Sequence, residues 1–194
     1  MKKIFSIILI FIFSILMSAF AEEKKLFGGD AGLVFAIPVY GDTSSPFSNR
    51  VLLGADGDIS LTLGTPLKLM LGADLISDIN WDGNKHKNHL DYAGWFGIKV
   101  YPGIAGLDAY LAYALGARTD YIEEEYENEL GEKQKKSVTE TTAWGNGFKL
   151  GIEYDFLHGS ERKTMPAIGF FYRMMPRGSK SYDNIFAFYV NMVF

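Results

Sequence analysis

Eight segments of this sequence alternate apolar and polar residues with a period of two, and this pattern constrains the fold more than any other feature. A strand places successive side chains on opposite faces, so each segment has one apolar face and one mixed face. The segments span residues 28–39, 51–63, 67–76, 90–101, 107–118, 147–156, 167–174 and 186–194. Each is about ten residues long, the length of a tilted strand that crosses a membrane. The pattern predicts an all-β chain.

The second face of each segment separates a membrane barrel from a soluble one. A soluble up-and-down barrel or sandwich also alternates, but its charged face meets water. Here the second face mixes isolated charges with small residues, which suits a crowded lumen, while the apolar face is uniformly bulky, which suits lipid tails. The sequence therefore favours a transmembrane antiparallel up-and-down β-barrel of about eight strands over the soluble alternative.

The connections between these segments alternate in length. Long polar connections span residues 41–49, 77–89, 119–142 and 176–183, and shorter ones span 64–66, 102–106 and 157–164. Outer-membrane barrels have long loops on the outer rim and short turns on the periplasmic rim. The alternation predicts an even number of strands with both chain ends on the periplasmic side.

The N-terminus predicts export. Lys2 and Lys3 precede an apolar run over residues 4–17, and Ala19 and Ala21 provide a small-x-small cleavage pattern before a polar stretch. Residues 1–21 are therefore expected to be a cleaved signal peptide, with an uncleaved anchor as the alternative. The barrel domain would span residues 22–194 and carry a formal charge of −6, since two lysines are lost from a chain of −4. This charge argues against nucleic-acid binding, and the absence of cysteine excludes disulfides.

If the bulky faces meet lipid, the other faces bring charged residues into the lumen. An eight-stranded barrel is only wide enough for side chains to fill it, so these charges predict a plug of ion pairs, with a proton or ion path as the alternative. Lys99 and Asp108 flank a short turn with matching parity and are the expected cross-strand pair. The predicted lumen network consists of Asp30, Asp56, Asp58, Lys68, Asp74, Asp91, Lys99, Asp108, Arg118, Lys149, Glu153, Asp155 and Arg173.

The last segment alternates up to a terminal phenylalanine. One face carries Phe186, Phe188, Val190, Met192 and Phe194. This segment is similar to the C-terminal strand motif read by the barrel-assembly machinery, and residues 22–194 resemble the small outer-membrane barrels represented by the OmpA membrane domain, OmpX and OmpW. The resemblance implies location in the outer membrane, outer-membrane lipid and the assembly machinery as partners, and no cofactor.

Other aromatic and histidine residues have structural explanations. Aromatic residues near strand ends are expected to form interfacial girdles, with ligand stacking as the alternative; they are Trp81, Trp95, Trp144, Tyr40, Tyr101 and Tyr154. His86 and His89 have a loose metal spacing without an obvious third ligand, so a solvated loop and no metal site are expected. A lipid-modifying rim enzyme would pair His89 with Ser77 or Ser137, but no catalytic residue is predicted.

The connection over residues 121–142 is the most distinctive surface feature. An acidic arm precedes Gly131 and a basic arm follows it, so the arms are expected to pair as a hairpin that extends two strands outward. The sequence favours a barrel that acts structurally or through such extracellular loops, on an extracellular ligand, with a solvated, variable loop as the alternative for this hairpin. The alternative is an OmpW-like conduit for small apolar solutes, which needs an apolar pocket around Met70, Trp95 and Phe171. The charged residues of the hairpin are Glu123, Glu124, Glu125, Glu127, Glu129, Lys133, Lys135 and Lys136.

Overall fold

Nine strands form one antiparallel sheet in the part of the chain that the computed structural model describes, which is residues 26–40, 51–64, 66–82, 85–156, 165–177 and 181–194. The predicted signal peptide lies outside these residues. The strands are β1 (Phe27–Tyr40), β2 (Leu52–Gly64), β3 (Leu67–Asp82), β4 (Lys85–Val100), β5 (Leu107–Glu127), β6 (Lys133–Thr141), β7 (Gly145–Asp155), β8 (Met165–Arg177) and β9 (Ser181–Val193). No helix within these ranges is long and apolar enough to cross a membrane.

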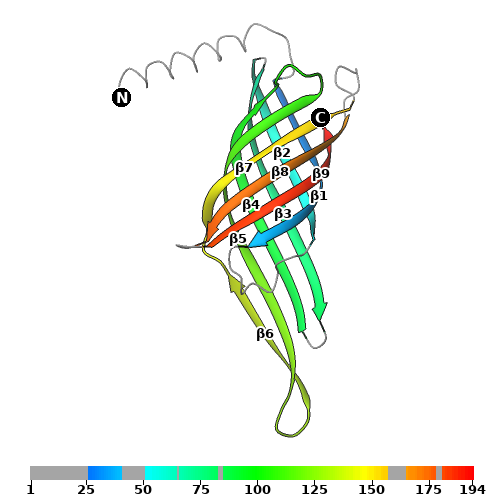
Figure 1. Cartoon of the computed structure of the whole chain (residues 1–194), viewed down its shortest axis with the longest axis vertical. Helices are drawn as coiled ribbons and strands as arrows, with labels where there is room; N and C mark the ends of the chain where they lie inside the picture. The colour runs from blue at the N-terminus through cyan, green and yellow to red at the C-terminus, as the bar shows by residue number, and fades with distance from the viewer. Residues whose placement is uncertain (1–25, 41–50, 65, 83–84, 157–164, 178–180) are drawn as a thin grey trace, which may run out of the picture.

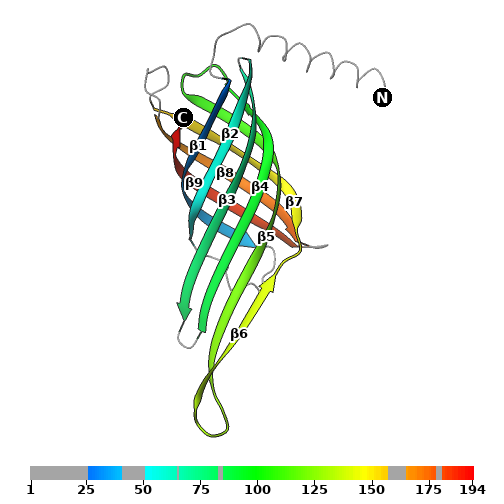
Figure 2. The same ribbon diagram turned by 180° about the vertical axis from the view of Figure 1, so that it is seen from behind.

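Eight of the strands close into a barrel. The first strand pairs with both β2 and β9, and β4 pairs with β5, so the sheet returns on itself (Figures 1 and 2). The one strand outside the barrel is β6, which pairs with β5 beyond residue 118, whereas β7 pairs with the N-terminal part of β5 up to Gly116. The predicted fold, an up-and-down antiparallel barrel of eight strands, is confirmed.

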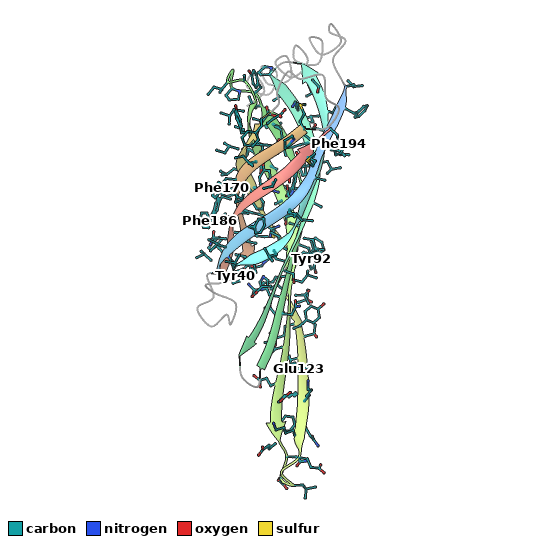
Figure 3. All side chains as sticks on the ribbon, turned by 90° about the vertical axis from the view of Figure 1, so that its right-hand side faces the viewer. Tyr40, Tyr92, Glu123, Phe170, Phe186 and Phe194 are labelled. Carbon is teal, nitrogen blue, oxygen red and sulfur yellow. The ribbon has the colours of Figure 1, made fainter. Side chains whose placement is uncertain are left out.

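Side chains alternate between the lumen and the outer surface along every wall strand. In β1 the residues Val34 and Ala36 are buried, while Leu33, Phe35 and Ile37, which alternate with them, are exposed. Figure 3 shows Phe170 and Phe186 directed away from the barrel in the same way. Most of the outer wall is thus covered by bulky apolar side chains, which water solvates poorly and lipid tails solvate well.

The two rims differ in shape. Both Phe27 and Phe194 lie at the rim where the connections are short, and the backbones of Gly29 and Phe194 are hydrogen-bonded there. At the other rim β3, β4, β5 and β6 continue beyond the wall (Figure 1). The prediction of loops over residues 77–89 and 176–183 was wrong in extent, because β3 and β4 pair as far as Asp82 and Lys85, and β8 and β9 as far as Arg177 and Ser181. Hydrophobic periodicity ends where the strands leave the membrane, although their backbone pairing continues.

A glycine in β3 leaves room for the ring of Trp95 in the crowded lumen. Trp95 lies directly opposite Gly72, and its ring occupies the place that a Cβ at Gly72 would take. We expect Gly72→Ala to lower the free energy of unfolding by about 1–3 kcal/mol, because the ring must leave a packed position. Urea unfolding in phospholipid vesicles measures this. The matched control is Gly94→Ala, where a new Cβ meets nothing closer than a carbonyl oxygen at 3.9 Å; equal losses in both variants would contradict the packing argument.

Candidate functional site

A chain of ion pairs crosses the middle of the lumen. The ammonium of Lys149 binds the carboxylates of Asp56 and Asp74, and the guanidinium of Arg173 bridges Asp74 and Asp91. All five side chains are buried and come from β2, β3, β4, β7 and β8. The pairs therefore join opposite walls. A buried charge needs such partners, because leaving one unpaired costs several kcal/mol.

The chain continues toward the rim from which the long strands protrude. Asp183 of β9 accepts hydrogen bonds from Arg118 at 2.9 Å and from Arg177 at 2.7 Å. Arg118 also donates to Asp120 at 3.0 Å, and Arg177 donates to the carbonyl oxygen of Gly116 at 2.7 Å. These contacts tie β5, β8 and β9 together where β5 leaves the barrel.

His89 belongs to this outer part of the lumen. The prediction of a solvated loop was wrong: His89 is fully buried, its Nε2 is hydrogen-bonded to the hydroxyl of Tyr40, and its Nδ1 lies 3.3 Å from Asp120. The Ser77 hydroxyl donates to the His89 carbonyl oxygen at 3.0 Å, which is a backbone contact and not a nucleophile–base pair. The parity of β4 turns His89 inward together with Asp91, and the rim encloses it.

A separate cluster lies near the rim with the short turns. The Lys99 ammonium is 3.0 Å from Asp30, 3.3 Å from Asp58 and 3.2 Å from Glu153, and the Asn191 amide donates to Asp30 at 2.6 Å. The predicted pairing of Lys99 with Asp108 was wrong. Tyr110, and not Asp108, lies opposite Lys99 in the β4–β5 register, and the long lysine side chain extends across the lumen. Asp108 pairs instead with Lys68 at 3.4 Å, where both side chains are partly exposed.

Aromatic rings fill the space between the ion pairs. The Lys149 ammonium lies 4.2 Å from the centre of the Trp95 ring and 4.0 Å from that of Phe171. Trp95 and Tyr40 are buried in the lumen, so their assignment to interfacial girdles was wrong, because both occupy inward positions of their strands. Trp144 and Tyr154 are exposed on the outer wall, and the Trp144 ring packs edge-on against Tyr92 at 5.7 Å.

The predicted lumen residues divide into a buried set and a rim set. Lys68, Asp108 and Asp155 lie at the short-turn end and are partly exposed, whereas the other ten are buried. Sequence reasoning missed Tyr40, His89, Arg177, Asp183 and Asn191. The period-two pattern could have located two of them. The inward row that contains Arg173 continues through Met175 to Arg177, and the row that contains Ala187 continues through Ile185 to Asp183.

The opposite rim carries a protruding sheet, which we define as the parts of β3, β4, β5 and β6 beyond the wall. In its β5–β6 hairpin, Glu124 lies opposite Lys136 and Glu125 opposite Lys135. The Lys135 ammonium is 2.6 Å from Glu123, and this hydrogen bond raises the pKa of Lys135 above its ordinary value. Figure 3 shows Glu123 well outside the barrel. Residues 121–141 contain seven glutamates and three lysines, a formal charge of −4.

The outer edge of the protruding sheet is β6. In the described part of the chain β6 pairs with β5 alone, and all nine of its residues are exposed. One row of backbone N–H and C=O groups therefore faces solvent, which is the arrangement that accepts a strand from another chain. The turn at the tip is ordered, because the Asn128 side chain accepts hydrogen bonds from the backbone N–H groups of Leu130 and Glu132.

The barrel has a shallow groove on its outer wall and, among the described residues, no metal-binding cluster. A shallow groove of about 530 Å³ lies on the wall of β2, β3 and β4, where Ala55, Gly57, Ala73 and Gly94 present little side chain. The apolar residues Met70, Trp95 and Phe171 are buried among the lumen side chains. Among the described residues, no group of three or more histidine or acidic side chains is arranged to hold a metal ion.

Solved structures share this architecture, although no protein-family model and no curated protein matches the chain. Ail, the attachment invasion locus protein of Yersinia pestis, aligns with a TM-score of 0.59 at 8% identity, over 87% of this chain and 97% of that chain. A structure of Ail in complex with the heparin analogue sucrose octasulfate aligns with a TM-score of 0.51 at 8% identity and the same coverage. Neisserial surface protein A aligns with a TM-score of 0.50 at 11% identity, over 88% and 98% of the chains.

At these identities the likeness shows the fold, which is that of the small outer-membrane barrels. The apolar side chains on the outer wall also indicate a membrane protein, because a closed barrel satisfies its backbone hydrogen bonds internally and can present apolar side chains to a bilayer. The chain is an integral outer-membrane β-barrel. Outer-membrane barrels place their short turns on the periplasmic side, and on this rule we expect the protruding sheet to stand outside the cell.

Proposed function

We propose that this barrel acts at the cell surface through its protruding sheet, while the ion pairs of the lumen keep the barrel closed and rigid. The observation that carries the proposal is the β5–β6 hairpin, which continues the wall as a paired sheet and exposes β6 along its whole length. Ordering a sheet outside the membrane costs conformational entropy. Contact with a partner strand would use its exposed edge and offset that cost.

Charge indicates the kind of partner. Ail is known in complex with a sulfated, strongly anionic sugar. The β5–β6 hairpin of the present barrel carries a formal charge of −4 over residues 121–141, and Glu123 and Glu125 already engage Lys135. An anionic sheet repels polyanions and attracts cationic surfaces. The proposed partner is therefore a protein with a basic surface that also lends a strand to β6.

A hairpin exchange tests the proposal. In the variant, residues 122–138 are replaced by an Asn-Gly turn, which shortens the hairpin and leaves the barrel part of β5 intact. Bacteria producing the wild-type protein should adhere to cultured epithelial cells or to one another, and the shortened variant should lose at least nine-tenths of this adherence. Both proteins should shift equally on heating before gel electrophoresis, which reports a folded barrel.

The matched control keeps the hairpin and changes its edge. Asn128 donates its N–H to the Glu132 carbonyl and Thr142 donates to that of Arg118, so the hydrogen-bonded pairs of the hairpin recur every second residue and include Ile122 with Val138. The N–H of Ser137 therefore points to the free edge. Ser137→Pro removes an edge donor and should lower adherence, whereas Val138→Pro breaks the β5–β6 ladder itself. Adherence that is the same in wild type and shortened variant, or the same in wild type and in cells lacking the protein, would contradict the proposal.

The conduit alternative has less support. It needs an open apolar pocket, but Trp95 and Phe171 pack against the Lys149 ammonium, and ion pairs bridge the lumen at that level. We expect planar-bilayer recordings of the wild-type barrel to show no discrete conductance steps. Regular steps that persist in the shortened-hairpin variant would indicate an open lumen and would favour the conduit.

A further inference from the structure

The cluster around Lys99 holds more negative than positive charge. Three carboxyl groups, those of Asp30, Asp58 and Glu153, surround one ammonium, so the cluster has a formal charge of −2 if every group is ionised. None of the four residues is more than 7% exposed. Ionised carboxylates in such an interior require compensating charge or hydrogen-bond donors.

Donors are lacking for part of the cluster. Both oxygens of Asp30 are satisfied, since Asn191 donates to Oδ1 at 2.6 Å and Lys99 donates to Oδ2 at 3.0 Å. In contrast, Asp58 Oδ1 and Glu153 Oε2 are buried without a hydrogen-bond partner among the described residues. Two buried carboxyl oxygens in one cluster therefore await a donor, which is uncommon in folded proteins.

The position of Asp58 indicates that the missing hydrogen-bond donor is a proton on its own carboxyl group. Asp30 and Asp58 lie directly opposite each other in the β1–β2 register, and like charges at such positions repel. A proton on Asp58 Oδ1 removes one charge and turns the free acceptor into a donor toward Asp30. We propose that this cluster is a proton-binding site, in which Asp58 is a neutral acid that donates its proton in a hydrogen bond to the Asp30 carboxylate.

Among the described residues, the surroundings do not supply another compensating charge. The titratable groups that face the cluster are Asp30 of β1, Asp56 of β2, Lys99 of β4, Asp108 and Tyr110 of β5, Glu153 of β7 and Tyr189 of β9. Lys99 is the one base among these, and Lys68 is engaged by Asp108 at the rim. Because the Lys99 ammonium already lies among the three carboxyls, a proton fits the remaining place better than a metal cation.

Infrared spectroscopy in deuterated buffer tests the proposal directly on the folded barrel in vesicles. The wild-type protein at neutral pH should show the C=O stretch of a protonated carboxyl. Asp58→Asn should abolish this band, because it removes the protonated carboxyl group. The asparagine NH₂ group can still donate to Asp30, and its carbonyl oxygen can still accept from Lys99. The control Asp56→Asn removes a carboxylate that Lys149 already neutralises and should keep the band. Absence of the band in the wild type, or its persistence in Asp58→Asn, would overturn the proposal.

The pH dependence of the stability of the wild-type barrel provides a second test, which can be made even where a variant fails to fold. A folded state that binds one more proton than the unfolded chain is favoured at low pH, so the folding equilibrium constant should fall as pH rises, by up to about tenfold per pH unit. Asp58→Asn should remove this part of the dependence. A wild-type stability that does not fall between mildly acidic and alkaline pH would overturn the proposal. Stabilisation by sodium or potassium but not choline, at fixed ionic strength, would do so as well, because it would indicate a bound cation.

Discussion

Replacing Arg173 with methionine should lower the free energy of unfolding of the barrel by about 3–5 kcal/mol. The guanidinium is 1% exposed and binds Asp74 and Asp91 together. Its loss leaves Asp74 with Lys149 at 3.4 Å and Asp91 with Arg177 at 3.9 Å, contacts too long to replace two charge-assisted hydrogen bonds. Urea unfolding in phospholipid vesicles, followed by tryptophan fluorescence, gives the difference.

Lys68→Met is the matched control for this prediction. It breaks an ion pair of 3.4 Å with Asp108, but the two side chains are 38% and 20% exposed, so water replaces the lost contact and the expected change is below about 1 kcal/mol. Adding Asp91→Asn to Arg173→Met should recover part of the loss, since one buried charge disappears. Equal, small effects of Arg173→Met and Lys68→Met would mean that water fills the lumen and that the ion pairs do not plug it.

Leu71→Arg should lower the free energy of unfolding in vesicles by about 2–4 kcal/mol, because it places a guanidinium on the lipid-facing wall. Leu71 is 57% exposed in the part of β3 that belongs to the barrel wall, between Ile59 of β2 and Phe96 of β4 on the same face. In a bilayer the charge meets hydrocarbon. The same vesicle assay measures the effect.

Val138→Arg supplies the comparison. Val138 is also an exposed apolar residue in a strand, but it lies on β6 in the protruding sheet, where a new charge meets water and the expected change is within about 0.5 kcal/mol. A Leu71→Arg variant as stable as Val138→Arg would contradict the placement of this wall in a membrane.

Period-two alternation was enough to predict the wall of the barrel. It predicted eight strands, because every wall strand has one lipid-facing row, and it placed Asp56, Asp74 and Arg173 on the inward face. The pairing of the inward charges was not predictable, because parity assigns a face and not a partner. Lys99 shows this: the turn suggested Asp108, but the side chain crosses to Asp30 and Glu153 on other strands.

The outer half of the site was predicted less well. Strands that leave the membrane lose their alternation, so residues 77–89 resembled a loop, and His89 was expected in solvent. The structure continues β3 and β4 through this region and buries His89 against Tyr40. The paired charges of the β5–β6 hairpin followed from the sequence because its two arms are adjacent in the chain.

By itself the sequence determined which side of each wall strand meets lipid and which residues face inward, because both follow from local alternation and the apolarity of a bilayer. The tertiary structure decided which charges pair across the lumen, which aromatic rings fill it, and that Asp58 faces Asp30 with an unsatisfied oxygen. Those contacts join strands far apart in the chain, and strand register and barrel closure set them together.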